Sequence, residues 1–257
     1  MTAFTMTAKR LLRSICRGAL PLLFWVGALW GIALLLNKPF LLPTPPAILS
    51  ALFELVGTAD FWVAIALSLL RVLGGLAIGV LAGTGIGILV HLFPAAALLL
   101  RPLLTVVRST PVASFVILVW SFTGSTVLPF VIAAMMVAPI VADELATGLS
   151  SADPSLSEMT DLFGFSRYRR FLVFRLPAAL PYFFGAVTTS VGFAWKAGVA
   201  AEILAATARS VGQRIYFSKL TLAIDELWAW TLVVVILSLI LELAVKKTLQ
   251  RIRRRSL

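Results

Sequence analysis

The sequence is poor in the residues that build redox and catalytic centres. Cys16 is its only cysteine and His91 its only histidine, so one chain can form neither an internal disulfide nor a cluster of thiolate ligands. The glycine-rich run 83–87 lacks the lysine of a Gly-x-x-x-x-Gly-Lys-Ser/Thr phosphate loop. Serine–histidine–aspartate sets and paired carboxylates are missing as well. The sequence therefore predicts neither a redox protein nor an enzyme, and any ATP hydrolysis must occur on a separate subunit.

Charged residues are also scarce, since they make up 13% of the 257 residues while 60% are hydrophobic. Soluble domains carry about 25% charged residues, so we predict a polytopic membrane protein, an all-α bundle of six transmembrane helices in a single domain over 1–257. A membrane-spanning helix needs about 20 apolar residues. Suitable runs lie near 18–36, 69–93, 107–123, 127–145, 182–206 and 227–245. We interpret the first as a retained span rather than a cleaved signal peptide.

The distribution of basic residues predicts the orientation of these spans. Most of the 22 Lys and Arg residues lie around 9–17, 101–108, 167–175 and 246–255, in alternate segments between the runs. Basic residues in short loops stay on the cytoplasmic side, so both termini are predicted to be cytoplasmic, in a cell inner membrane. Topology and anionic lipids then explain the net charge of +11, and no nucleic-acid partner is predicted.

Two segments are predicted to lie on the external side. Residues 47–56 have the apolar spacing of a helix that lies on the membrane surface. The polar segment 207–226 is suited to contact with another protein.

The segment 153–181 is a polar interruption on the predicted cytoplasmic side. Asp153 and Pro154 are suited to begin a helix, Gly164 to end it in a left-handed conformation, and Ser166 to cap a second helix. Both helices have apolar faces, which comprise Leu156, Met159 and Phe163 in the first and Tyr168, Phe171 and Phe174 in the second. Such faces need a partner.

The order of residues in this segment resembles the cytoplasmic loop of ABC importer permeases, which docks on an ATPase. Glu158, Gly164, Phe174, Leu176 and Pro177 fall in the register of that loop, while Met159 and Thr160 replace its two alanines. The resemblance implies that the ATPase is contacted by Glu158, Met159, Phe163, Gly164, Ser166, Arg167, Phe174, Leu176 and Pro177. The alternative is a pair of helices lying on the membrane, with their arginines at lipid phosphates.

Four glycines, Gly75, Gly79, Gly83 and Gly87, recur at four-residue spacing in the second apolar run. This spacing places them on one stripe of a helix and permits the close approach of another helix. We predict a packing seam, whose neighbour could belong to the same chain or to a second copy. The alternative is that glycine is simply common in membrane helices.

Charged residues within the apolar runs are candidates for a translocation pathway. Lys196 lies well inside the run 182–206, where a charge usually faces a cavity or a partner; it could instead form a structural ion pair with Glu202. Ala194-Trp195 and Ala201-Glu202 resemble a pattern of the nitrate, sulfonate and taurine branch of these permeases. The pathway candidates are Trp195, Lys196, Glu202 and Arg71. For Arg71 the favoured alternative is that it reaches water at the outer interface.

Two further polar positions lie near predicted cytoplasmic helix ends. His91 is interpreted as an interfacial residue, because it lacks nearby ligand partners in the sequence, and no metal site is predicted. Asp143 and Glu144 could pair with arginines of the segment 153–181 or form a solvated helix end.

The resemblance covers the chain from about residue 43 to its end and implies the type I ABC importer permease fold. It implies the membrane-spanning subunit of an ATP-driven importer of a small solute, with the closest likeness to the nitrate, sulfonate, taurine and bicarbonate branch. This likeness implies that the solute is an anion. The implied partners are cytoplasmic ATPases that hold the ATP and Mg²⁺, an external substrate-binding protein and a second permease copy forming a homodimer. No cofactor is expected in this chain. The alternative is a secondary transporter or channel, which would need more buried ionisable residues.

Overall fold

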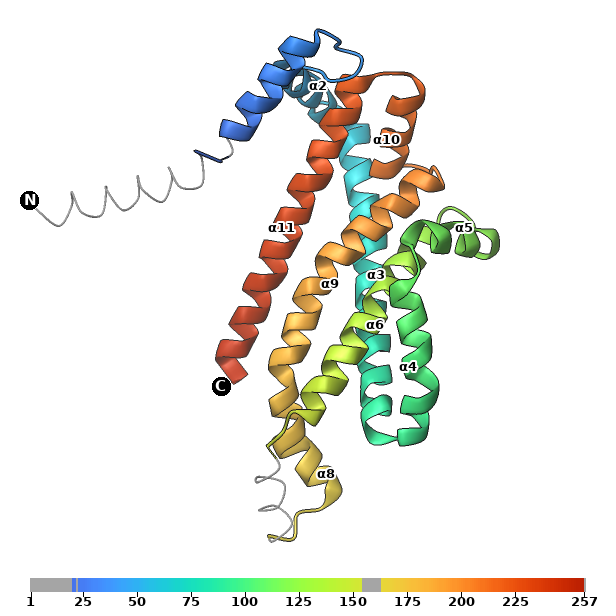
Figure 1. The fold of residues 1–257 in the computed structure, drawn as a ribbon, viewed down its shortest axis with the longest axis vertical. Coiled ribbons are helices and arrows are strands. Elements are labelled where there is room, and N and C mark those ends of the chain that lie inside the picture. Colours follow the sequence, from blue (N-terminus) through green and yellow to red (C-terminus); the bar gives the residue numbers. More distant parts are fainter. Residues whose placement is uncertain (1–19, 22, 154–162, 257) are drawn as a thin grey trace, which may run out of the picture.

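The computed structural model describes residues 20–21, 23–153 and 163–256, and the regular structure in this part of the chain is entirely helical (Figure 1). A helix at Leu23–Leu36 comes first. It is followed by α2 (Pro45–Val56), α3 (Ala59–Leu92), α4 (Pro94–Ser109), α5 (Val112–Thr123), α6 (Leu128–Ser150), α8 (Arg167–Arg170), the π-helical turn η1 (Phe171–Arg175), α9 (Leu176–Leu204), α10 (Val211–Leu220) and α11 (Ile224–Ser256). The predicted all-α bundle is confirmed.

The number of membrane spans agrees only approximately with the predicted six. Within the described residues, four helices are long and apolar enough to cross a membrane, namely Ala59–Leu92, Leu128–Ser150, Tyr168–Leu204 and Ile224–Ile252. The bent pair formed by α4 and α5 raises the count to five if it is taken as one span. The helix at Leu23–Leu36, where the first span was predicted, is shorter than these.

The predicted span 107–123 is wrong as a single helix. The chain is helical up to Ser109, and after a short break α5 leaves at an angle of 107° to α4. Thr110 has an extended backbone, with φ −77° and ψ 132°, because the ring of the following Pro111 disfavours the helical conformation at the residue before it. The apolar composition of the run continues across this break.

Helix α3 begins well before the run 69–93 that predicted it. The Thr58 side chain caps the helix by accepting a hydrogen bond from the backbone N–H of Phe61 at 3.3 Å. Arg71 therefore lies inside α3 and not at its outer end.

The neighbour of the glycine stripe is α6 of the same chain. A Cβ atom on Gly79, Gly83 or Gly87 would lie 2.5–2.8 Å from the backbone oxygen of Ala134, Ala138 or Ala142, respectively, and one on Gly75 would overlap the backbone of Phe130. The contacts repeat every four residues on both helices. The two backbones thus touch over four successive levels, which leaves no room for side chains between them.

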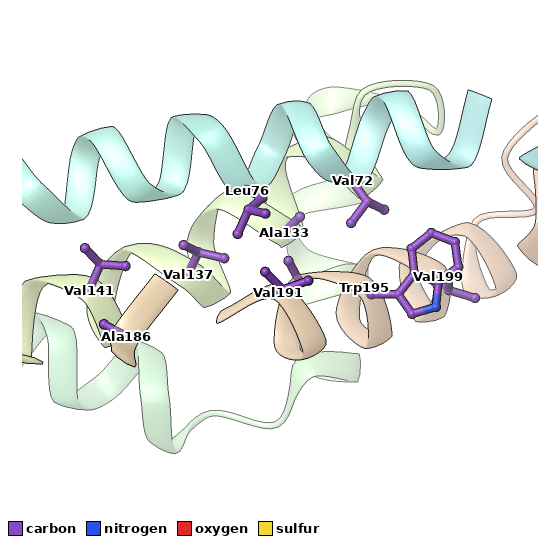
Figure 2. Close-up of a cluster of buried hydrophobic side chains, with 10 residues drawn as sticks. Val72, Leu76, Ala133, Val137, Val141, Ala186, Val191, Trp195 and Val199 are labelled. Atoms are coloured by element: carbon purple, nitrogen blue, oxygen red, sulfur yellow. The ribbon is translucent and has the colours of Figure 1, made fainter. Parts of the chain in front are cut away.

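The main core joins α3, α6 and α9. Figure 2 shows buried side chains of the three helices directed toward one another: Val72 and Leu76 from α3, Ala133, Val137 and Val141 from α6, and Ala186, Val191, Trp195 and Val199 from α9. Helices α10 and α11 pack on this core at the end opposite α8 and along its side (Figure 1).

Candidate functional site

The described part of the segment 153–181 has the local geometry that the sequence predicts. Gly164 has φ 68°, in the left-handed region. The Ser166 hydroxyl then accepts a hydrogen bond from the backbone N–H of Arg169 at 3.3 Å, and α8 begins at Arg167. The predicted contact residues Glu158 and Met159 lie outside the described residues.

The aromatic side chains of this segment have different surroundings. Phe163 and Tyr168 are both 73% exposed. Phe174 packs on the ring of Phe165, at 6.2 Å between ring centroids, while Phe171 packs against buried residues of α6 and α9. The segment therefore presents Phe163 and Tyr168 outward and anchors itself with Phe171. Leu176 and Pro177 form the first turn of α9, which continues from η1.

His91 lies at the end of α3 that faces this segment, and it contacts two other elements. Its Nδ1 atom is 3.1 Å from the Ser150 hydroxyl at the end of α6. Its Nε2 atom is 2.9 Å from Nη1 of Arg175, the last residue of η1. The histidine that was predicted to be merely interfacial thus connects α3, α6 and the segment before α9.

The carboxylate of Asp143 pairs with Arg108 of α4. Both side chains are about half exposed. They border a polar cavity of about 720 Å³ whose lining is completed by Arg101, Glu144, Ala146, Thr147, Ser150 and Ser151. The cavity is thus lined by residues of α4 and of the second half of α6.

At the opposite end of the bundle, Glu202 is completely buried in the last turn of α9. Its Oε2 atom accepts hydrogen bonds from the Ser68 hydroxyl at 2.7 Å and from the backbone N–H of Gly212 at 3.2 Å. Its Oε1 atom lies 3.6 Å from Nη1 of Arg71. The cation beside Glu202 is therefore Arg71 of α3, and not Lys196 as one interpretation of the sequence had it.

Arg71 does not extend to water at the outer interface, because its guanidinium is held within this cluster. Its side chain is only 15% exposed, and Nη2 donates a hydrogen bond to the carbonyl of Ala208 at 3.1 Å. Ser68 lies one turn before Arg71 and also accepts a hydrogen bond from the backbone N–H of Val211 at 3.0 Å. Ser68 is not among the predicted site residues, although its spacing of three residues from Arg71 places both on one helix face.

Trp195 is a core residue. It is fully buried, and its indole N–H donates a hydrogen bond to the carbonyl of Val234 in α11 at 3.0 Å. An indole that is packed and hydrogen-bonded in this way holds α9 against α11.

Lys196 points to the other side of α9, where it belongs to a stripe of exposed residues that also includes Tyr182, Gly185, Thr189 and Phe193. The end of the stripe nearest α8 borders a cavity of about 420 Å³. This cavity is lined by Ile140 and Glu144 of α6 and by Pro181, Tyr182, Gly185, Ala186 and Thr189 of α9. One side of α9 thus forms the core while the other side carries polar groups and a cationic side chain at the surface.

No group of three or more His, Cys, Asp or Glu side chains is arranged to hold a metal ion within residues 20–153 and 163–256, residue 22 aside.

Comparison with known proteins identifies relatives along most of the chain. Residues 75–254 match the family described as binding-protein-dependent transport system inner membrane component. The chain is 29% identical to the taurine transport system permease protein TauC of Escherichia coli, over 87% of this chain and 83% of the relative. It is 31% identical to the bicarbonate transport system permease protein CmpB of Synechococcus elongatus, over 64% of this chain and 62% of the relative.

The fold is similar to that of a chain in the crystal structure of a bacterial ABC transporter involved in the import of the acidic polysaccharide alginate. The TM-score is 0.59 at 17% identity, and the match covers 95% of this chain and 99% of that chain. The similarity thus extends over nearly the whole of both folds.

Proposed function

Because the chain belongs to the family of binding-protein-dependent transport system inner membrane components, we propose that it forms the membrane pathway for a small anionic solute in an ATP-driven importer. The chain is a permease subunit and not itself an enzyme. The relatives named above are transport system permease proteins, which favours this proposal over a secondary transporter or channel. The proposed substrate class rests on relatives named for taurine, which carries a sulfonate, and for bicarbonate.

The position of Lys196 is the observation that carries the pathway proposal. It is exposed on α9, inside the candidate span Tyr168–Leu204. A lysine near the middle of a membrane costs about 2.5–3.5 kcal/mol when it faces lipid. Its stripe also carries Thr189 and Gly185, which leave polar groups at the surface. This face of α9 therefore lines an aqueous pathway, which a second copy of the chain closes from the other side.

The remaining pathway candidates have a supporting role in this proposal. Trp195 and Glu202 are completely buried, and Arg71 is nearly so. They hold the outer end of α9 in place and do not touch the solute.

Coupling to ATP hydrolysis is assigned to the loop from Glu158 to Pro181. In its described part, Phe163 and Tyr168 expose large aromatic surfaces at the end of the bundle where α8 lies (Figure 1). A separate cytoplasmic ATPase, which binds the ATP and Mg²⁺, covers these side chains. The segment continues directly into α9, so a movement of the ATPase reaches the helix that carries Lys196.

An external substrate-binding protein is the proposed partner at the opposite end. The outer segment around α10 exposes Phe217, Leu220 and Leu222, which are 48%, 58% and 77% exposed. Phe217 and Leu220 are three residues apart on α10 and so lie on one face of it. Exposed apolar side chains that are neighbours in this way are typical of a protein contact.

Uptake measurements on Lys196 variants test the proposal. The full chain is reconstituted in proteoliposomes with its ATPase and binding protein, and uptake of radiolabelled taurine, an alkanesulfonate, nitrate and bicarbonate is measured with and without ATP. We expect ATP-dependent uptake of one of these anions. Because a hydrogen bond to a charged group contributes about 1.5–3 kcal/mol, Lys196→Gln should lower it by about ten-fold or more, while Lys196→Arg keeps most of it.

Lys246→Gln is the matched control, because Lys246 is an exposed lysine on α11, outside the exposed stripe of α9. It should leave uptake unchanged. Uptake that is equal in the Lys196→Gln variant and the unmodified chain would remove Lys196 from the pathway. Failure to transport any of the four anions would refute the proposed substrate class.

A further inference from the structure

His91 occupies the junction of three elements at the end of the bundle near α8. Its ring nitrogens lie 3.1 Å from the Ser150 hydroxyl and 2.9 Å from Nη1 of Arg175. The Ser150 hydroxyl in turn donates to the carbonyl of Ala146, one turn earlier in α6, at 2.9 Å. The four groups form a continuous line from η1 through α3 to α6.

Elementary hydrogen-bond chemistry fixes every proton in this line. A guanidinium group can only donate, so Nε2 of His91 is the acceptor and carries no proton. The neutral imidazole then holds its proton on Nδ1 and donates it to the oxygen of Ser150, whose own hydrogen is directed to Ala146. The line is therefore a relay of three hydrogen bonds with one direction, from Arg175 to Ala146. A doubly protonated ring has no acceptor for Arg175 and would place a second positive charge beside it.

The relay connects the closely packed pair of α3 and α6 to the π-helical turn η1. Helices α3 and α6 are in backbone contact from Gly75 to Gly87, so His91 and Ser150 belong to a closely packed pair. Arg175 closes the π-helical turn η1 and is exposed. π-Helical turns within α-helices are frequent at functional sites. The relay is thus a polar link, with defined direction, between the segment before α9 and the α3–α6 pair.

Apolar contacts at this junction do not replace the relay. Phe171 of η1 packs against Leu145, Leu149 and Ala179, with Ile88 of α3 nearby. Such contacts hold the elements together but tolerate sliding, because dispersion is not directional. Hydrogen bonds weaken steeply when donor and acceptor move out of line. The relay therefore adds to these apolar contacts a directional link, which is lost when its groups move out of line.

We propose that His91 is a positioning residue for transport. In its neutral form with the proton on Nδ1, it transmits movement of Arg175, in the segment 153–181 assigned to ATPase docking, to the α3–α6 helix pair. The inference rests on the proposed function of that segment. It predicts that breaking the relay separates ATP hydrolysis from solute movement without preventing the assembly of the transporter.

The protonation state can be measured without transport. His91 is the only histidine in the chain, so a chain purified without a histidine tag and labelled with ¹⁵N-histidine in lipid nanodiscs gives one pair of ring nitrogen resonances. We expect a protonated Nδ1 and an unprotonated Nε2. Arg175→Leu should move the proton toward Nε2, because the acceptor role of that nitrogen is lost. A proton on Nε2 in the unmodified chain would overturn the relay.

The coupling role is tested by the amount of solute moved per ATP hydrolysed in the complete transporter. His91→Leu removes both hydrogen bonds and should lower this ratio by about five-fold or more, which is the smallest effect typical of coupled sites. His91→Gln retains an acceptor oxygen and an N–H donor and should restore most of it. Thr105→Val is the control, because the one hydrogen bond of the Thr105 hydroxyl within the described residues goes to the carbonyl of Arg101 in its own helix, at 2.9 Å.

Arg175→Leu provides a second test if the His91→Leu variant does not assemble. It should lower the ratio as His91→Leu does, and the double variant should lower it no further. An unchanged solute-to-ATP ratio in the assembled Leu variants would overturn the inference. If the unmodified transporter itself moved no solute on ATP hydrolysis, the proposed function would fail instead, while the ring nitrogen spectrum would still decide the state of His91.

Discussion

The seam between α3 and α6 makes a sharp prediction about two neighbouring glycines. Gly83 faces α6, and a Cβ atom there would lie 2.5 Å from the backbone oxygen of Ala138 and 2.8 Å from Cβ of Val141. Gly85, two residues later, is exposed and would have nothing within 4 Å of such an atom. Replacing each by alanine therefore makes the same chemical change on the same helix in two different surroundings.

The difference between the two variants isolates the packing cost. Both gain about 1 kcal/mol of helix propensity when glycine becomes alanine. At Gly83 the helices must also separate by about 0.9 Å to restore the ordinary contact distance of 3.4 Å from the present 2.5 Å. Overpacking of this kind costs about 1–3 kcal/mol. Gly83→Ala should thus be less stable than Gly85→Ala by about 1–3 kcal/mol.

Thermal unfolding in detergent measures this difference. The folded fraction that survives heating is followed by size-exclusion chromatography. For a chain of this size, 1 kcal/mol of stability corresponds to about 2–4 °C in the unfolding midpoint. Gly83→Ala should therefore unfold several degrees below Gly85→Ala. Gly85→Ala itself should match or exceed the unmodified chain. Equal midpoints for the two alanine variants would refute close backbone contact along the seam.

Two further predictions concern the ends of the bundle. Gly164 and Gly124 both have φ near 70°, with no atom within 4 Å of an added Cβ, so valine should strain both turns alike. Only Gly164→Val should weaken ATPase binding in a pull-down from membranes. Equal binding of the ATPase by both variants would remove the docking role of the Gly164 turn. Ser68→Ala should destabilise the chain by about 1–3 kcal/mol in the same thermal assay, because it leaves Glu202 without one buried donor. The control Ser190→Ala should not destabilise it, since the buried Ser190 hydroxyl makes no hydrogen bond within the described residues. A Ser68→Ala variant as stable as Ser190→Ala would show that the Glu202 cluster adds nothing to stability.

Features encoded in local spacing could be predicted from the sequence, whereas breaks and long-range partners could not. The glycine stripe and the cap at Ser166 follow from spacing and residue type alone. The span 107–123 failed because average hydropathy does not detect a change of backbone direction, although Pro111 marked the place. Pairing of Arg71 with Glu202 could not be foreseen, since the two residues lie on different helices and only the fold brings them together.

The two polar clusters explain how α9 keeps its position in an apolar environment. Lipid tails are as apolar as the helix surfaces, so apolar contact alone does little to fix one membrane helix against another. Helix α9 begins directly after Arg175, which bonds to His91. Its last turn holds Glu202, which bonds to Ser68 and faces Arg71. All three partners belong to α3, with His91 in its last turn and Ser68 and Arg71 in its first half. A shift of α9 along its axis would therefore break hydrogen bonds at both ends at once. This constraint makes α9 and α3 move together, and it places the exposed side of α9, with Lys196, at a defined height in the membrane.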